Sequence, residues 1–156
     1  MHVEARDRVL VLTLDRPEAR NAIDATTTGE IEVALDAFEA DPDLWVCVIT
    51  HRGPVFCAGA DLKAVASGGG RGIESAKHGF ASICARVRTK PLIAALEGPA
   101  LAGGFEIALA CDCIVASANG WVTLARFVVL LTSPPAEPIP KRTELGPRDS
   151  SSRSTT

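Results

Sequence analysis

The sequence predicts a single α/β domain, and three observations lead to that fold class. Short runs rich in β-branched and aliphatic residues alternate with stretches whose apolar residues recur at helical spacing, which is typical of βαβ units. Residues that favour turns separate these runs. The chain has 156 residues, of which 47% are hydrophobic and 22% are charged, as in ordinary globular domains. This composition excludes a wholly disordered chain, a coiled coil and a collagen-like fibre.

The first predicted elements are a strand and a helix. Residues 8–15 (RVLVLTLD) form a β-rich run. Thr27, followed by Glu30 three residues later, predicts a capping box at the start of a helix. Apolar residues at helical spacing continue this helix as far as Pro42, and residues 44–50 (LWVCVIT) then form a buried strand.

The same alternation continues in the following residues. Residues 51–61 form a loop that contains Gly59, and the triple glycine at 68–70 precedes another predicted helix. That helix would place the apolar residues of 76–87 on one face. Three further elements follow: a strand at 91–96, a helix at 101–110 and a strand at 112–116.

The composition changes near residue 132. Residues 133–156 hold five of the ten prolines and very few apolar residues. Such a segment cannot bury enough surface to offset the entropy of ordering it. We therefore expect a partial domain over residues 1–132 and a disordered Pro/Ser-rich tail over residues 133–156.

Charge, hydrophobicity and cysteine content argue against a nucleic-acid-binding, membrane or disulfide-linked secreted protein. The formal net charge is −3, so no basic field points to nucleic acid as a partner. No apolar run is long enough to span a bilayer, and the first residues lack the apolar core of a secretory signal. The five cysteines are odd in number and form no CxxC pair, which argues against a disulfide framework. These observations predict a cytoplasmic protein without a membrane partner.

Two glycine-containing segments carry the functional signal. In residues 55–63 (VFCAGADLK), Gly59 permits a sharp turn that leaves backbone N–H groups free to face a ligand. In residues 98–106 (GPALAGGFE), two glycines at a helix start expose N–H donors of the kind that stabilise an oxyanion, and Glu106 is a candidate acid or base. Either segment alone also fits an ordinary structural loop. The three histidines are far apart, so no metal site is expected.

In combination, three segments resemble the enoyl-CoA hydratase/isomerase (crotonase) family. They are RPEARNAI at 16–23, FCAGADLK at 56–63 and GPALAGGFEIALACD at 98–112, and the resemblance runs from about residue 8 to residue 118. It implies a crotonase-like (ClpP/crotonase) spiral of ββα units around a pocket for a CoA thioester. The function it implies is an enoyl-CoA hydratase that adds water to a 2-enoyl-CoA thioester in fatty-acid β-oxidation. Coenzyme A is then part of the substrate, and no separate cofactor is expected.

The resemblance also implies roles for individual residues. By position, the backbone N–H groups of Ala60 and Gly103 fall on the family's oxyanion hole. Glu106 matches the first of the two glutamates that position and activate water, and Lys63 is expected to reach the phosphates of coenzyme A. The residues expected to contact coenzyme A are Arg16, Ala19, Arg20, Ala58, Asp61, Leu62 and Lys63.

The match ends near residue 118, and the position of the family's second glutamate falls on Arg126. Arginine does not release its proton at neutral pH, so it cannot serve as a general acid. We therefore expect a truncated chain without the family's C-terminal helices, produced by a reading-frame change near residues 118–120. Loss of those helices would expose an apolar patch that includes Trp121 and residues 127–131.

Three interpretations stay open at the level of the sequence. In the first, the chain is a hydratase that uses Glu106 as its acid or base. In the second, it is a catalytically impaired remnant that binds an acyl-CoA thioester, or a partner crotonase chain, without turnover. In the third, which the combined motifs disfavour, it is an unrelated α/β domain with two structural glycine loops. A homo-oligomer like the family's trimer or hexamer is expected only if the absent trimer-forming region is supplied from elsewhere.

Overall fold

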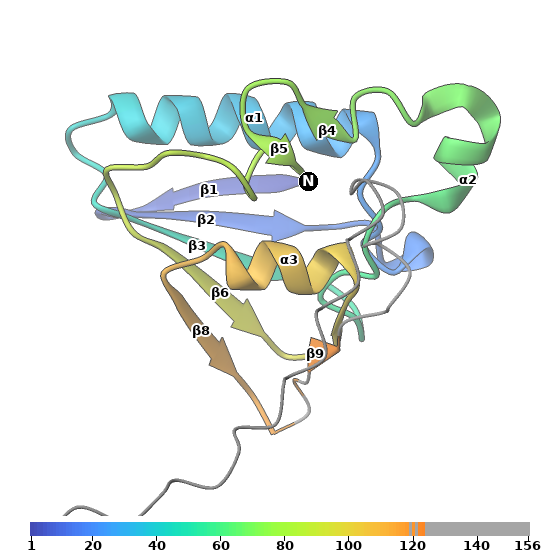
Figure 1. Ribbon diagram of the computed structural model, residues 1–156. Coiled ribbons are helices and arrows are strands. Elements are labelled where there is room, and N and C mark those ends of the chain that lie inside the picture. Colours follow the sequence, from blue (N-terminus) through green and yellow to red (C-terminus); the bar gives the residue numbers. More distant parts are fainter. Residues whose placement is uncertain (119, 121, 124–156) are drawn as a thin grey trace, which may run out of the picture.

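The computed structural model describes residues 1–118, 120, 122 and 123, and its centre is a twisted five-stranded sheet (Figure 1). The strand order is β1-β2-β3-β6-β8. The first pair is antiparallel, and the three later neighbours are parallel. The strands are β1 (His2–Arg6), β2 (Val9–Leu14), β3 (Val46–His51), β6 (Leu92–Leu96) and β8 (Cys113–Ala116).

Helix α1 (Ala25–Ala40) connects β2 to β3 and covers one face of the sheet (Figure 1). Its first residues are capped by Asp24, whose carboxylate accepts from the Thr27 amide at 2.8 Å and from the Thr27 hydroxyl at 2.8 Å. The predicted capping box is therefore wrong, because Thr27 lies inside the helix that it was expected to cap. The real cap is the aspartate three residues earlier.

The core lies between this face of the sheet and the two helices α1 and α3 (Gly103–Leu109). Along β2 and β3 every second side chain is buried, as expected for strands with one covered face. Both helices contribute to the same core cluster, so the helix that carries Glu106 is fixed against the centre of the sheet. The largest fully buried side chains include Phe38, Phe56, Leu12, Ile23, Ile31, Leu35, Ile49, Leu92 and Ile107.

A second, smaller layer of extended segments lies at the end of the main sheet. Strand β7 (Ala100–Leu101) pairs in parallel with β9 (Val122–Thr123). Single parallel bridges join Cys57 to Ala100 and Ile23 to Ala60. These pairings bring three segments that are distant in the sequence into one layer, and that layer contains both glycine segments.

The predicted helix over residues 76–87 is wrong. A two-stranded hairpin, β4 (Glu74–Ser75) and β5 (Gly79–Phe80), is followed by turns. Ala81 and Ser82 have φ angles of 52° and 56°, in the left-handed region that interrupts a helix. Val87, which a helix would have buried, is 91% exposed. Before the hairpin come α2 (Leu62–Ala64) and a π-helical segment η2 (Val65–Gly69), and η1 (Pro17–Ala19) is a 3-10 turn after β2.

The sheet ends in a strand that is open to solvent. All four residues of β8 are exposed, and the neighbouring Leu109 is 57% exposed. Cys113 is exposed, because β8 is the edge strand and nothing among the described residues covers it. Trp45 is 59% exposed, and the Arg8 guanidinium lies 4.1 Å from the centre of its ring.

Some expectations fall outside the described residues. These are the disordered tail at 133–156, the arginine at position 126 and the apolar patch around Trp121. Within the described ranges, no helix has both the length and the apolar character needed to cross a membrane.

Candidate active site

The two glycine segments meet at one point of the molecule. A methyl group built on Gly59 would lie 3.0 Å from the Gly103 nitrogen, and one built on Gly103 would lie 3.3 Å from the Gly59 Cα. Gly59 has a φ of +95°, a conformation that side chains rarely adopt. Only residues without a side chain allow this approach, which explains why glycine stands at both positions.

Among the residues that the structure describes, two backbone N–H groups at this junction have no protein acceptor. The bonds from the Ile23 amide to the Gly59 carbonyl and from the Asp61 amide to the Ile23 carbonyl are both 2.8 Å long. They flank Ala60, so the N–H of Ala60 points to the opposite side of its strand. Among the described residues, no hydrogen-bond acceptor faces the N–H of Ala60 or of Gly103. Two unpaired donors side by side can bind a negatively charged oxygen.

Close packing fixes the start of α3 at this place. A methyl group on Gly104 would come 2.2 Å from the Cys57 carbonyl oxygen, which is backbone and cannot move aside easily. Ala102, which precedes the helix, has φ 49° and ψ −120°. Because Ala102 has a side chain, this conformation strains its backbone, and strain of this kind is found at ligand sites. The helix therefore starts at a position imposed by the loop that contains Gly59.

Glu106 lies in the first turn of α3 and is half-buried. Its amide donates to the Ala102 carbonyl at 3.2 Å, so the residue is held to the strained turn. Within the described part of the chain, its carboxylate makes no hydrogen bond or ion pair with another side chain. A carboxylate beside two free N–H donors is suited to move protons at a carbon next to a carbonyl group.

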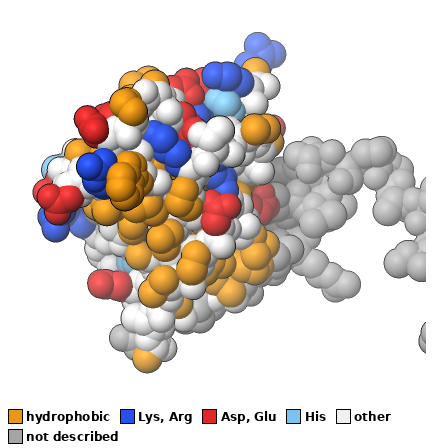
Figure 2. Space-filling view, turned by 90° about the vertical axis from the view of Figure 1, so that its left-hand side faces the viewer, with side chains coloured by type: hydrophobic (Ala, Val, Ile, Leu, Met, Phe, Trp, Pro, Cys, Tyr) orange, Lys and Arg blue, Asp and Glu red, His pale blue; other side chains and the backbone are white. Residues whose placement is uncertain are grey.

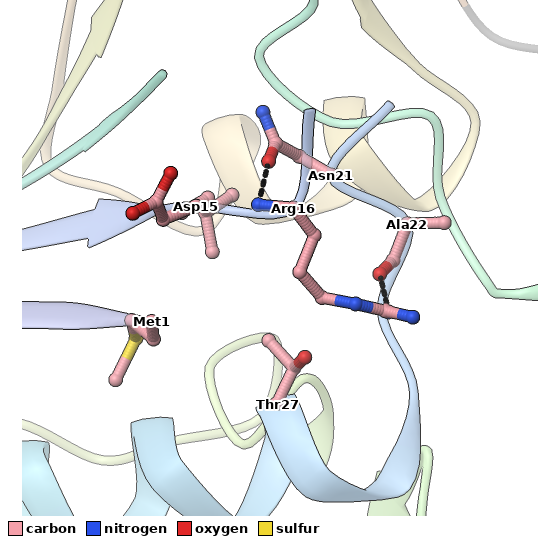
Figure 3. Close-up of a pocket in the computed structure, with 7 residues that line it drawn as sticks. Met1, Asp15, Arg16, Asn21, Ala22 and Thr27 are labelled. Atoms are coloured by element: carbon pink, nitrogen blue, oxygen red, sulfur yellow. Dashed lines mark hydrogen bonds between the residues drawn. The ribbon is translucent and has the colours of Figure 1, made fainter. Parts of the chain in front are cut away.

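The segments expected to hold coenzyme A lie side by side. The Ala58 amide donates to the Arg20 carbonyl at 3.0 Å, which joins residues 16–23 to residues 56–63. The guanidinium of Arg16 is held by other groups of the protein. It lies 3.0 Å from Asp24 and 3.1 Å from Asp61. It also donates to the Ala22 carbonyl at 2.6 Å (Figure 3). Arg16 thus ties the two segments together.

Asp61 shows the effect of this arrangement. Hydrogen bonding from the Ala64 amide, together with the nearby Arg16 guanidinium and against the opposing effect of burial, holds the pKa of Asp61 below its usual value. Asp61 also caps α2, since its carboxylate accepts from the amides of Lys63 and Ala64. The carboxylate therefore shapes the turn that follows Ala60.

Other residues of this set are free to meet a ligand. The cationic side chains of Arg20 and Lys63 are exposed, and within the described ranges neither takes part in an ion pair. Leu62 is 75% exposed, while Ala19 and Ala58 are half-buried. The cavity beside Arg16 (Figure 3) measures about 10 Å³, which suits a single water and not coenzyme A. An open apolar groove of about 570 Å³ lies between β1 and α1, away from Glu106.

Sequence reasoning missed a third segment at this site. The ring of Phe80 packs on Gly103, since a methyl group there would lie 2.6 Å from two of its ring carbons. Cys84 follows in the same turn, and burial, then the charge of Glu106, raise the pKa of its thiol to about 12. Phe80 fitted the pattern of a helical core residue, so no separate sequence signal pointed to this wall of the site.

The thiols here are inert. Burial raises the pKa of Cys57 to about 12, and its sulfur accepts from the Gly59 amide at 3.4 Å. A buried thiol of this kind packs in the loop instead of acting as a nucleophile.

One cluster of possible metal ligands lies away from the glycine segments. The ligand atoms of Glu32, Asp36 and His78 are all within 4.8 Å of one another. Cationic side chains already neutralise Asp36, because Arg86 lies 2.7 Å and Lys77 lies 3.8 Å from its carboxylate. Burial, and then the charge of Arg86, lower the pKa of His78. The cluster thus joins α1 to the β4–β5 hairpin.

Comparisons with known proteins find curated relatives of this chain. A mevalonyl-coenzyme A hydratase of Aspergillus fumigatus is 46% identical over 113 residues, which cover 71% of this chain and 42% of that protein. A carnitinyl-CoA dehydratase of Proteus mirabilis is 46% identical over 121 residues, which cover 76% of this chain and 46% of that protein. The chain thus spans less than half the length of these curated relatives.

Solved structures also match most of this chain and about half of their own chains. The crystal structure of the enoyl-CoA hydratase EchA1 from Mycobacterium marinum superimposes with a TM-score of 0.74 at 43% identity, over 79% of this chain and 48% of that one. A carnitinyl-CoA hydratase from Mycobacterium avium gives a TM-score of 0.71 at 40% identity, over 78% of this chain and 47% of that one. The crotonase-like fold expected from the sequence is therefore confirmed for the described residues. The family model for enoyl-CoA hydratase/isomerase matches residues 4–132, and the chain belongs to that family.

Proposed function

We propose that this chain carries out hydration of 2-enoyl-CoA thioesters of the kind that arise in fatty-acid degradation. The observation that supports it most is the pair of N–H groups on Ala60 and Gly103, which lie at the contact between the two glycine segments and have no acceptor among the described residues. Glu106 lies beside them on α3. The relatives named as hydratases and dehydratases of CoA thioesters favour the same chemistry.

The proposed reaction follows from these groups. When water adds to the double bond, negative charge gathers on the thioester oxygen. The amides of Ala60 and Gly103 stabilise this enolate, and a single donor of this kind typically contributes about 2.7–4 kcal/mol to lowering the barrier. Glu106 transfers a proton between water and the acyl carbons. Arg20 and Lys63 attract the phosphates of coenzyme A, and the unpaired cysteines suit the reducing cytoplasm.

A test of this proposal is the hydration of crotonyl-CoA by the purified chain, with Glu106→Gln as the comparison. We expect Glu106→Gln to lower kcat by about 10²-fold or more, the range for removing a general acid or base, with thermal unfolding unchanged. Turnover that survives this substitution would overturn the role of Glu106. Failure of the native chain to bind any CoA thioester would overturn the proposal as a whole.

The second candidate function is binding of an acyl-CoA thioester without turnover. It is favoured by the absence of any Asp or Glu from the sequence between Asp112 and Glu137, where the resemblance places the second glutamate. Butyryl-CoA, which has no double bond to hydrate, measures binding alone. Binding of butyryl-CoA without hydration of crotonyl-CoA would select this second function.

A further inference from the structure

The β4–β5 hairpin is fixed to helix α1 by polar contacts. Ser75 and Ser82 both donate to the Glu32 carboxylate, the second at 2.8 Å. The buried Arg86 donates to the Ser82 carbonyl at 2.9 Å and to Asp36 at 2.7 Å. These contacts hold the turn at Ala81 and Ser82 in its left-handed conformation. The hairpin therefore has a defined orientation relative to α1.

That orientation decides where Glu74 points. Side chains alternate between the two faces of a strand, and Ser75 faces α1 because it bonds to Glu32. Its neighbour Glu74 therefore projects away from α1. Glu74 is also the direct partner of Phe80 in the antiparallel ladder, and directly paired residues project from the same face.

Phe80 shows what lies on that face. Its ring packs on Gly103, whose N–H is one of the two unpaired donors. The side chain of Glu74 thus leaves the hairpin on the same side as the ring that packs on Gly103. Burial is the main reason why the pKa of the Cys84 thiol is raised, and the charges of Glu106 and, more weakly, Glu74 raise it further. Both carboxylates therefore lie near this thiol. Within the described part of the chain, Glu74 forms no ion pair that would occupy it.

We propose that Glu74 is the second carboxylate of the hydration site, facing Glu106 across the site that the Ala60 and Gly103 amides mark. This inference rests on the proposed function. Glu74 holds the attacking water and accepts its proton as the water oxygen bonds to Cβ. The π electrons of the double bond move to form the enolate on the thioester oxygen. Glu106 then donates a proton to Cα, which restores the carbonyl group, and both glutamates exchange protons with solvent before the next turnover.

The test compares three glutamine variants of the full chain. They are Glu74→Gln, Glu106→Gln and a matched control, Glu97→Gln. Glu97 is, like Glu74, exposed and without an ion pair to any described residue, but it follows β6 and lies outside the proposed site. For Glu74→Gln we expect a loss in kcat for crotonyl-CoA of about 10²-fold or more, with the Kd for butyryl-CoA unchanged within about twofold. We expect Glu97→Gln to keep both values.

The pH profile separates a catalytic role from a structural one. If Glu74 must be ionised to accept a proton, kcat/KM of the native chain falls at low pH, and Glu74→Gln removes that limb of the profile. A loss of activity that leaves the limb in place would overturn the assignment.

The remaining outcomes distinguish this inference from the proposed function. If Glu106→Gln abolishes hydration and Glu74→Gln does not change it, Glu74 is excluded and the proposed function stands. If the native chain binds butyryl-CoA without hydrating crotonyl-CoA, Glu74 supplies no second carboxylate and only the binding function survives. If no CoA thioester binds, both proposals fall together.

Discussion

The middle of the main sheet and its β8 edge are built from similar residues in opposite surroundings. Leu12 in β2 is fully buried, whereas Val115 in β8 is 59% exposed. Both belong to apolar runs that form parallel ladders with a neighbour. The side of the molecule that lies at the left in Figure 1 carries many hydrophobic side chains across its middle and lower part (Figure 2).

The contrast between β2 and β8 shows that strand formation and burial are separate properties of a sequence. Strand β8 is held by its ladder to β6 and by Asp112, whose carboxylate accepts from the Leu92 amide at 2.8 Å. This needs no cover on either face. The central strands are instead fixed by what lies on them, namely α1 and α3. The four predictions below test that distinction.

The largest expected effect concerns the close packing at the start of α3, the helix that leads into β8. In Gly104→Ala the new methyl group would meet the Cys57 carbonyl at 2.2 Å. We expect a loss of about 3 kcal/mol or more in the free energy of unfolding, as for severe overpacking. Urea unfolding followed by circular dichroism measures it.

Gly29→Ala is the matched control for this substitution. Gly29 lies inside α1 with nothing within 4 Å of an added methyl group, so alanine should stabilise the chain by about 0.5–1 kcal/mol. Equal effects of the two substitutions would show that packing at the start of α3 is looser than described.

The second prediction sharpens the contrast directly. Leu12→Ala removes a fully buried side chain from the middle of the sheet, and we expect a loss of about 2–5 kcal/mol in the free energy of unfolding. Chemical denaturation at a fixed pH gives the value. A loss of under 1 kcal/mol would mean that the core cluster around β2 can collapse to fill the cavity.

The third prediction uses protonation of His51 at the end of β3. Burial lowers the pKa of His51 from its ordinary value of 6.5, so the unfolded chain binds the proton more readily. Stability is therefore present at pH 7.5 and is lost as the pH falls below 6.5. Carboxylates such as Asp61, with lowered pKa values, lose their contribution only at lower pH, below about 4.

Unfolding free energies at pH 7.5 and 5.5 test this point, and His51→Gln should reduce the difference between them. His2→Gln is the edge-strand control, since His2 is exposed on β1. A pH dependence that His2→Gln removes and His51→Gln leaves intact would contradict the assignment to the middle of the sheet.

The smallest effect is expected at the β8 edge. Val115→Thr changes an exposed side chain to a polar one that strands accept equally well, so the free energy of unfolding should change by no more than about 0.5 kcal/mol. A large loss would show that β8 is covered in solution, which light scattering at several protein concentrations would then reveal as association.

The strands at 9–14, 46–51, 92–96 and 113–116 were predicted from the sequence to within about two residues. Their residue types signal a strand locally, whatever lies around them. The adjacency of the 16–23, 56–63 and 98–106 segments followed from the family resemblance. The roles of Ala60, Gly103 and Glu106 remain predictions for the experiments described above.

The segment at 74–86 could not be predicted in the same way. Its apolar residues fit a helix, but its conformation depends on distant partners: Arg86 bonds to Asp36, and Phe80 packs on Gly103. Such contacts leave no periodic trace in the sequence. The N-cap at Asp24 was missed for a related reason, because both Asp24 and Thr27 are good caps and only the geometry separates them.

The parallel ladder has a consequence for how the chain folds. Within the five-stranded sheet, only β1 and β2 pair through a tight turn, at Asp7, whose φ is 52°. Every later strand of this sheet reaches its neighbour only after a long intervening segment has closed, and such non-local pairing slows folding. Among the described residues, the β1–β2 hairpin with α1 can therefore form before the rest of this sheet, and the junction of the two glycine segments is among the last parts to form.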